Sequence, residues 1–209
     1  MLDENCYVLS DDISRECVII DCGALYEPEH IAIINYIRDK NLKPIHLLCT
    51  HGHLDHNFGN GAIFQTFGLQ AEVHFADKNM LETINDQATK FFGVPLNCTT
   101  APIGKLLNGT EKISYGSQVL DIIYTPGHTE GSVVFHNKEQ KIAFTGDTLF
   151  QMSIGRTDLE GGDYEKIISS LHLIATTLPP ETTIYPGHGP STTMQKELQY
   201  NPYLKKCSV

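Results

Sequence analysis

Short apolar runs separated by turn residues recur along the whole chain, and they predict a fold rich in β-strands. Each of these runs is four to nine residues long and is bounded by polar residues, glycine or proline, which is typical of strands. The predicted strands are residues 6–9, 16–21, 44–50, 71–75, 118–126, 132–137, 141–147 and 182–189.

Between these strands, apolar residues recur at helical spacing. Ile31, Ile34 and Ile37 lie on one helix face, and a later segment repeats the spacing from Ile167 to Ile174. The predicted helices are residues 29–41, 77–92, 163–178 and 194–200. Strands interspersed with helices indicate one α/β domain in which helices cover the sheets.

Composition narrows the classes of protein further. Hydrophobic residues make up 41% of the 209 positions and charged residues 19%, which is typical of a globular protein with one core. The formal net charge of −10 argues against nucleic acid or an anionic membrane as a partner, because phosphate groups need a positive surface. A small-molecule substrate is the expected partner.

The chain shows no sign of export. Its first residues are acidic where a signal peptide needs basic ones, and no apolar run approaches the roughly 20 residues of a membrane span. We therefore expect a cytoplasmic protein whose cysteines are reduced. The sequence has six cysteines and no C-x-x-C pair, namely Cys6, Cys17, Cys22, Cys49, Cys98 and Cys207.

The stretch CTHGHLDHNFGNG, residues 49–61, contains several possible metal ligands close together. His51, His53, Asp55 and His56 fall within six residues, directly after an apolar strand. Imidazole nitrogen and carboxylate oxygen are ligands that zinc accepts, so the cluster predicts part of a metal site. The alternative is a solvated polar loop. Further metal-binding side chains elsewhere in the chain would favour the metal site over this alternative.

Three later side chains share one layout. His128, Asp147 and His188 each follow an apolar strand, in a tight turn that contains glycine. A lone histidine in such a place is more often structural, but three such strand ends beside the dense cluster indicate convergence on one site. The remaining histidines, which lack this layout and receive no role, are His30, His46, His74, His136 and His172.

The order H-x-H-x-D-H, then one histidine, one aspartate and a final histidine, resembles the metallo-β-lactamase-fold hydrolase superfamily. The resemblance runs from NCYVLSDD to IYPGHGP, nearly the whole chain. It implies a single domain over residues 1–209 with an αββα sandwich: two sheets packed together, helices outside, and a two-metal site at one edge.

The resemblance also implies roles for the predicted ligands. The first metal would bind His51, His53 and His128, the second would bind Asp55, His56 and His188, and Asp147 would bridge the two. Zinc is the expected metal, with iron and manganese as alternatives. Two such cations can share a water, lower its pKa and hold it against a carbonyl carbon, while they stabilise the oxyanion that forms.

Two further residues receive roles from the resemblance. Asp55 would orient the metal-bridging hydroxide. Asp21 resembles an aspartate beside the site that supports a ligand by a hydrogen bond, and the alternative reading is a residue that merely ends a strand.

The segment GDTLFQMSIGRTDLEGGD resembles the G-R-x-D element of hydroxyacylglutathione hydrolases (glyoxalase II). Arg156 and Asp158 are expected to form an ion pair that braces the loop behind Asp147, with a substrate contact of Arg156 as the alternative. About twenty residues follow His188, so we expect no C-terminal glutathione-binding helical region, and the closing NPYL resembles shorter bacterial forms. The family's first edge strand is expected to be missing or supplied by another element.

These features predict a dinuclear metal-dependent hydrolase of a thioester or related ester, with S-lactoylglutathione as the first candidate. One alternative is a persulfide dioxygenase that binds a single iron through His51, His128 and Asp147, a two-histidine-one-carboxylate set. A further alternative is a non-catalytic metal-binding module. A di-iron redox module usually has glutamate at the position of His53, and exported β-lactamases and RNA-processing relatives are disfavoured by the missing signal and the charge.

Overall fold

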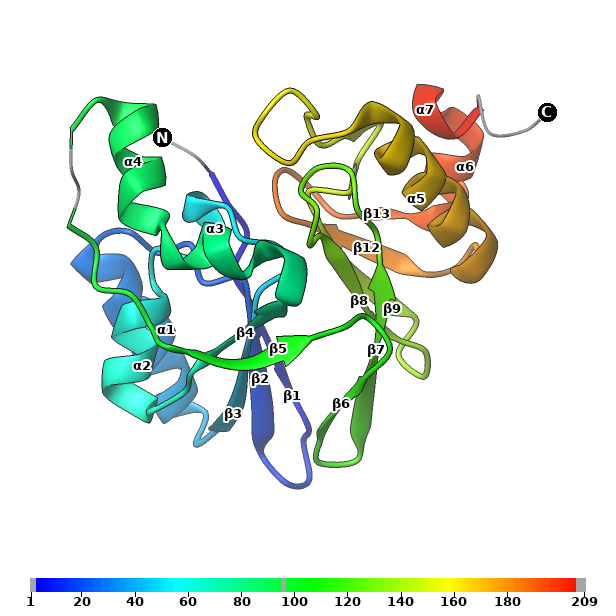
Figure 1. Ribbon diagram of the computed structural model, residues 1–209. Coiled ribbons are helices and arrows are strands. Elements are labelled where there is room, and N and C mark those ends of the chain that lie inside the picture. The colour runs from blue at the N-terminus through cyan, green and yellow to red at the C-terminus, as the bar shows by residue number, and fades with distance from the viewer. Residues whose placement is uncertain (1–2, 95–96, 206–209) are drawn as a thin grey trace.

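Two β-sheets packed against each other form the centre of the protein, and helices lie outside both of them (Figure 1). The computed structural model describes residues 3–94 and 97–205. The first sheet has the order β1-β2-β3-β4-β5. Its strands are β1 (Tyr7–Ser10), β2 (Glu16–Ile20), β3 (Lys43–Leu48), β4 (Ala71–His74) and β5 (Ile103–Leu107). Strand β1 is antiparallel to β2, and the other neighbours are parallel.

The second sheet has the order β13-β12-β9-β8-β7-β6. Only the β9–β12 pair is parallel in it. Its strands are β6 (Lys112–Tyr115), β7 (Gln118–Tyr124), β8 (Val133–Asn137), β9 (Ile142–Gly146), β12 (Thr183–Pro186) and β13 (Thr192–Thr193). A small hairpin of β10 (Leu149–Phe150) and β11 (Ser153–Ile154) follows β9.

Helices flank both sheets (Figure 1). Those beside the first sheet are α1 (Glu27–Asp39), α2 (Asn60–Phe67), α3 (Lys78–Glu82) and α4 (Ile84–Phe92). Those beside the second sheet are α5 (Tyr164–Thr177), α6 (Met194–Tyr200) and α7 (Pro202–Lys205). Two single-turn 3-10 helices, η1 (Leu54–His56) and η2 (Phe75–Asp77), follow β3 and β4. This arrangement confirms the α/β fold with helices on the outside.

The apolar side chains sort into three layers, which explains why the elements stack in this order. Between the sheets, Ile20 and Leu48 pack with Phe135 and Phe144. Outside the first sheet, Ile37 of α1 is buried in a second layer. Outside the second sheet, Leu171 and Ile174 of α5 are buried in a third layer. Burying each such side chain contributes about 1.5–3 kcal/mol relative to leaving it in water.

Strand β8 shows how the sequence specifies burial on two sides. Val133 and Phe135 point between the sheets, whereas Val134 points to the layer beneath α5. The strand is therefore apolar at consecutive positions rather than alternating.

The predicted helix at 77–92 is wrong in one respect, because the structure has two helices there. They meet at Thr83, whose φ of −108° and ψ of 25° leave the helical region. Its hydroxyl donates to the backbone oxygens of Asn79 and Met80, which ends α3. A short polar side chain that bonds nearby backbone in this way competes with the regular helix ladder.

The other helix predictions need smaller corrections. Helix α1 starts at Glu27 rather than residue 29, with Pro28 in its first turn, where its missing N–H costs nothing. Ile31 was predicted on the apolar face, but it is 48% exposed, and Ile33 packs there instead. Helix α2 and strand β5 are not among the predicted elements. The residues of β5 are mostly exposed, so its apolar pattern is weak.

Among the described residues, five cysteines are free thiols, as expected: Cys6, Cys17, Cys22, Cys49 and Cys98. Cys207 lies outside the described residues. No helix in the described part of the chain combines the length and the apolar character needed to cross a bilayer.

Candidate metal centre

The predicted metal-binding side chains follow the C-terminal ends of four strands. His51 and His53 follow β3, and Asp55 and His56 lie in η1 just beyond. The other three come from the second sheet, after strands β7, β9 and β12: His128, Asp147 and His188. The pairings place β7, β9 and β12 in one common direction, so their ends reach the same edge. The structure thus brings together side chains that are up to 137 positions apart.

One group of possible ligands consists of three buried histidines. His53 Nδ1 lies 2.8 Å from His128 Nε2. The ring of His51 is edge-on to both, at centroid distances of 4.9 Å from His53 and 4.8 Å from His128. One nitrogen from each ring lies within 4.8 Å of the other two, a spacing that one ion could bridge.

A second group combines a carboxylate with two histidines. His188 Nε2 lies 3.3 Å from Asp55 Oδ2 and 3.3 Å from His56 Nε2. These three atoms also fall within 4.8 Å of one another. His56 is fully buried, whereas the side chain of His188 is 27% exposed, so this group is the more accessible of the two.

Asp147 lies between the two groups. Its Oδ1 is 3.3 Å from His56 Nε2 in the second group, and its Oδ2 is 3.4 Å from His128 Nε2 in the first. Oδ2 also lies 3.6 Å from His188 Nε2. A single carboxylate therefore faces both sets of nitrogens.

Two buried polar atoms without hydrogen-bond partners bear on whether this arrangement fits metal ions. His51 Nε2 and Asp147 Oδ1 are buried, and no hydrogen-bond partner for either exists in the described part of the chain. An unsatisfied buried polar group costs about 1–3 kcal/mol. Imidazole nitrogens and carboxylate oxygens that converge in this way can all be satisfied by a cation placed between them. The residues present therefore fit metal ions.

Burial keeps the first group neutral. It lowers the pKa of His51 well below its usual value and that of His53 to about 3, and neighbouring imidazoles lower both further. The pKa of His128 is also lowered, first by burial, against the opposing charge of Asp147. Neutral imidazoles offer free lone pairs, which is the form that binds metal.

The charges in the second group depend on Asp147. Burial opposes its ionisation, but His56 and His128 outweigh burial and hold the pKa of Asp147 at about 2. Burial likewise disfavours the cationic form of His56, yet Asp147 and Asp21 raise the pKa of that imidazole well above its usual value. The raised pKa of His56 keeps this imidazole cationic beside the ionised Asp147.

Asp21 contacts one of the predicted ligands. Its Oδ2 lies 3.0 Å from His56 Nδ1. The same carboxylate accepts hydrogen bonds from the backbone N–H and the hydroxyl of Thr50, both at 2.7 Å. These bonds fix the ring of His56 and hold Asp21 in the left-handed region at φ 50°. Asp21 falls within 4.8 Å of His51 and His56 as a third grouping, but its oxygens are already occupied.

Asp77, which is predicted only to start a helix, links two ligand loops. It accepts hydrogen bonds from Gly52 N–H at 2.9 Å, from Gly131 N–H at 2.7 Å and from the Thr129 hydroxyl at 2.6 Å. Gly52 separates His51 from His53 in the sequence, and Thr129 follows His128. Asp77 lies just past the end of a strand, as His128, Asp147 and His188 do, and this position could have indicated its role.

The N-terminal segment, also unassigned from sequence, holds His188. The imidazole Nδ1 of His188 donates to the Asp3 backbone oxygen at 2.9 Å, and Asn5 N–H donates to Gly187 O at 2.8 Å. Glu4 Oε1 lies 3.9 Å from His56 Nδ1. Burial raises the pKa of Glu4 to about 10, although His56 opposes this, so the carboxyl is protonated at neutral pH.

Arg156 and Asp158 form the expected ion pair, with Nε–Oδ1 and Nη2–Oδ2 distances of 2.7 Å and 2.6 Å. Both side chains are exposed. The contact with the site comes from the backbone, because His128 Nδ1 donates to the Arg156 carbonyl at 2.8 Å. The loop thus orients a predicted ligand through its main chain.

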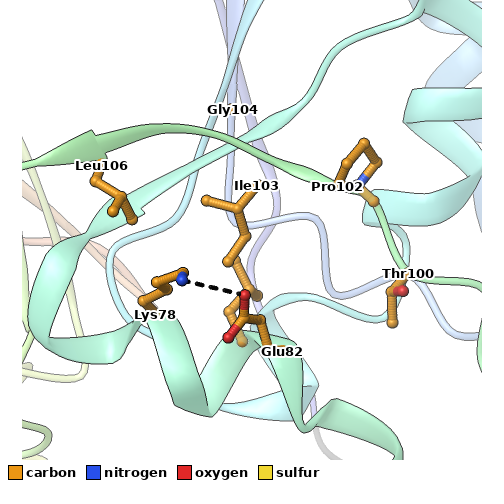
Figure 2. Close-up of a pocket in the computed structure, with 9 residues that line it drawn as sticks. Lys78, Glu82, Thr100, Pro102, Ile103, Gly104 and Leu106 are labelled. Atoms are coloured by element: carbon orange, nitrogen blue, oxygen red, sulfur yellow. Dashed lines mark ion pairs between the residues drawn. The ribbon is translucent and has the colours of Figure 1, made fainter.

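Two hollows border helix α3. The larger, of about 1040 Å³, is lined by His53 and by residues of α3, α4 and the segment 159–161. The smaller, of about 450 Å³, lies beside β5, where Lys78 and Glu82 form an ion pair at 3.5 Å (Figure 2). None of the predicted metal-binding residues lines the smaller hollow.

Comparison with known proteins agrees with this geometry. The sequence model of the metallo-beta-lactamase superfamily matches residues 2–188, so the chain belongs to that superfamily. Hydroxyacylglutathione hydrolase GloC of Haemophilus influenzae is 36% identical over 206 residues, 98% of this chain and 94% of that protein. Family membership and the histidine–aspartate groups together point to metal ions as the cofactor.

Two solved structures share the fold. The BLEG-1 B3 metallo-beta-lactamase superposes with a TM-score of 0.87 at 35% identity, covering 97% of this chain and 95% of that one. TTHA1623, solved in a di-iron-bound form, gives a TM-score of 0.83 at 32% identity, covering 97% and 96%. These matches confirm the metallo-β-lactamase type of αββα fold.

Proposed function

We propose that this protein is a dinuclear metal-dependent hydrolase of thioesters or related small esters. The observation that carries the proposal is the position of Asp147 between two separate groups of ligand-type atoms, each able to hold one ion. A site for one ion would need only one of these groups.

The assignment of ligands follows the grouping. His51, His53 and His128 would hold the first ion. The second ion would bind Asp55, His56 and His188. Asp147 would bind both ions. Zinc accepts this nitrogen and oxygen set, and iron is the alternative supported by the di-iron-bound relative. When bound, the ions lower the pKa of a water towards neutrality and attract the charge that develops on a carbonyl oxygen.

The chain's own residues then position the reactants. Asp55 stays ionised, because hydrogen bonding and charge from His188 and His56 outweigh burial and lower its pKa. Its carboxylate would accept a hydrogen bond from the attacking water and turn a lone pair towards the substrate. Asp21 and the Arg156 carbonyl hold the rings of His56 and His128, so the ligands need little rearrangement.

A thioester suits this set of residues. A thiol has a pKa near 8.5, so a thiolate leaves without first receiving a proton. The reaction therefore needs a nucleophile and a stabilised oxyanion, and it does not require a dedicated general acid. The relative named hydroxyacylglutathione hydrolase supports the same class, and S-lactoylglutathione is the first substrate to examine.

The test is hydrolysis of S-lactoylglutathione and of phenyl thioacetate by metal-replete and chelator-stripped protein, with metal content measured on the same samples. We expect two ions per chain and turnover that disappears on stripping and returns with metal. One iron per chain with oxygen uptake on glutathione persulfide would instead establish a dioxygenase. Two bound ions without turnover of any activated ester would establish a metal-binding module.

A further inference from the structure

The larger hollow is the part of the structure that bears on the choice of substrate. Its volume of about 1040 Å³ lies at the upper end for small-molecule sites. His53, one of the predicted ligands, lines it, so a molecule in the hollow reaches the candidate metal centre. One wall comes from α3 and α4, and the other from Glu130 and the segment 159–161.

The charged side chains of this hollow are mostly acidic. Lys90 is its one cationic side chain, and its Nζ lies 3.4 Å from Glu160 Oε2, so these two charges offset each other. Asp86 and Glu130 also line the hollow, and no ion pair to either is found within residues 3–94 and 97–205. Asp77 also lines the hollow, but it is buried and its carboxylate already accepts three hydrogen bonds. The exposed surplus is therefore the two carboxylates of Asp86 and Glu130.

Apolar side chains line the same hollow as these carboxylates. Met80 and Leu159 line the hollow, and Phe91 lines it with 51% of its surface exposed. An aromatic face beside carboxylates attracts an alkylammonium group, because the ring and the anions act on the same positive charge. An anionic tail meets like charge at the same place.

We propose that the substrate's leaving thiol carries a positive charge, as in a thioester of an aminothiol, and that Glu130 and Asp86 select it. This inference rests on the proposed hydrolase function. Glutathione carries two carboxylates and one ammonium, so its thioesters should be hydrolysed, but with a lower kcat/KM than thioesters of a cationic thiol. The acyl group would lie at the metal centre beside His53, and the cationic tail would extend between α4 and Glu130.

The experiment compares three acetyl thioesters that differ in the charge of the thiol. They are acetylthiocholine (cationic), S-acetyl-N-acetylcysteamine (neutral) and S-acetyl-3-mercaptopropionate (anionic). Thiol release by metal-replete protein at low ionic strength gives kcat/KM for each. Each value is divided by the rate constant for hydroxide hydrolysis of the same ester, which removes differences in intrinsic reactivity.

We expect the normalised kcat/KM to fall from cation to neutral to anion, with a total ratio of about tenfold or more that shrinks as salt is added. Glu130→Gln and Asp86→Asn should each reduce the cation-to-anion ratio by about threefold, since each removes one charge that acts through partly solvated space. Glu82→Gln is the matched control, because Glu82 lines the smaller hollow, and the ratio should not change (Figure 2).

Equal or reversed preference between cation and anion, in protein that hydrolyses the neutral ester, would overturn the charge inference and leave the hydrolase intact. A ratio that survives in the Glu130→Gln Asp86→Asn double variant would also overturn it. If protein with two bound ions hydrolysed none of the three esters, the proposed function would be overturned, and the inference with it.

Discussion

The Asp77 carboxylate accepts the backbone N–H of Gly52 at 2.9 Å, and this contact fixes the loop between His51 and His53. The same carboxylate holds the turn that follows His128 through the Thr129 hydroxyl. Three side chains that would bind one ion are thus placed by a residue that lies outside the ligand set. Hydrogen bonds of the protein itself therefore help to set the spacing of these side chains.

Asp77→Asn should therefore weaken both the fold and metal binding. The amide keeps the size of the side chain but turns an NH₂ group towards backbone donors, so a buried donor loses its partner at a cost of about 1–3 kcal/mol. Loss of such a supporting contact typically lowers metal affinity by about 10- to 100-fold. Urea unfolding of metal-free protein and a metal titration measure the two effects.

Asp86→Asn is the matched control for this variant, since Asp86 is an exposed aspartate of α4. It should unfold and bind metal as the wild type does. Metal affinity of Asp77→Asn equal to that of the wild type would show that Asp77 does not position the ligands.

Asp147→Ala should lose metal and activity together, because one carboxylate faces both groups of ligand atoms. The expected result is fewer than two ions per chain and no detectable thioester hydrolysis. Asp158→Ala, which removes an exposed aspartate, should keep both. If Asp147→Ala retained two ions and wild-type turnover, the bridging assignment would be wrong.

Gly155→Ala should be far more damaging than Arg156→Ala. A Cβ at residue 155 would lie 1.9 Å from the Asp147 backbone oxygen and 2.9 Å from His128 Nδ1, so the backbone must move. Overpacking of this kind costs about 1–3 kcal/mol, and here it displaces two predicted ligands. Arg156→Ala removes only an exposed side chain, because the bond to His128 uses the backbone carbonyl.

Thermal unfolding and metal content of the two variants distinguish these cases. Gly155→Ala should melt earlier and carry less metal, and Arg156→Ala should match the wild type in both. A marked loss of activity in Arg156→Ala with normal metal content would assign its side chain to substrate binding instead.

Glu4→Gln should stabilise the metal-free protein increasingly as pH rises. Burial raises the pKa of Glu4 from 4.5 to about 10, so between these values the folded chain keeps a proton that the unfolded chain has released. Stability contributed by this group is therefore present below pH 4.5 and falls as pH rises above it. Glutamine is neutral throughout and removes this dependence.

Urea unfolding of the chelator-treated wild type and variant at pH 5.5, 7.0 and 8.5 would measure the effect. The difference in unfolding free energy should grow with pH in favour of Glu4→Gln. If the unfolding free energies of the wild type and Glu4→Gln differed by a constant amount from pH 5.5 to 8.5, Glu4 would be ionised in the folded protein.

The sequence predicted eight of the strands and the convergence of seven side chains, because strand ends and ligand chemistry are local signals. The supporting residues were harder to predict. Asp77 and Glu4 act through contacts with residues far away in the chain, and neither residue type indicates this by itself. The break at Thr83 and the exposure of Ile31 depend on which neighbours pack against the helix, which periodicity does not specify.

The division of the ligand-type residues between the two sheets also sets an order of assembly. A nascent chain that has emerged from the ribosome only as far as β5 displays His51, His53, Asp55 and His56, but none of the side chains from the second sheet. The centre is completed only when His188 has been synthesised and the two sheets have docked. Each of the two groups of ligand-type atoms is thus complete only late in biosynthesis, because each needs a histidine from the second sheet.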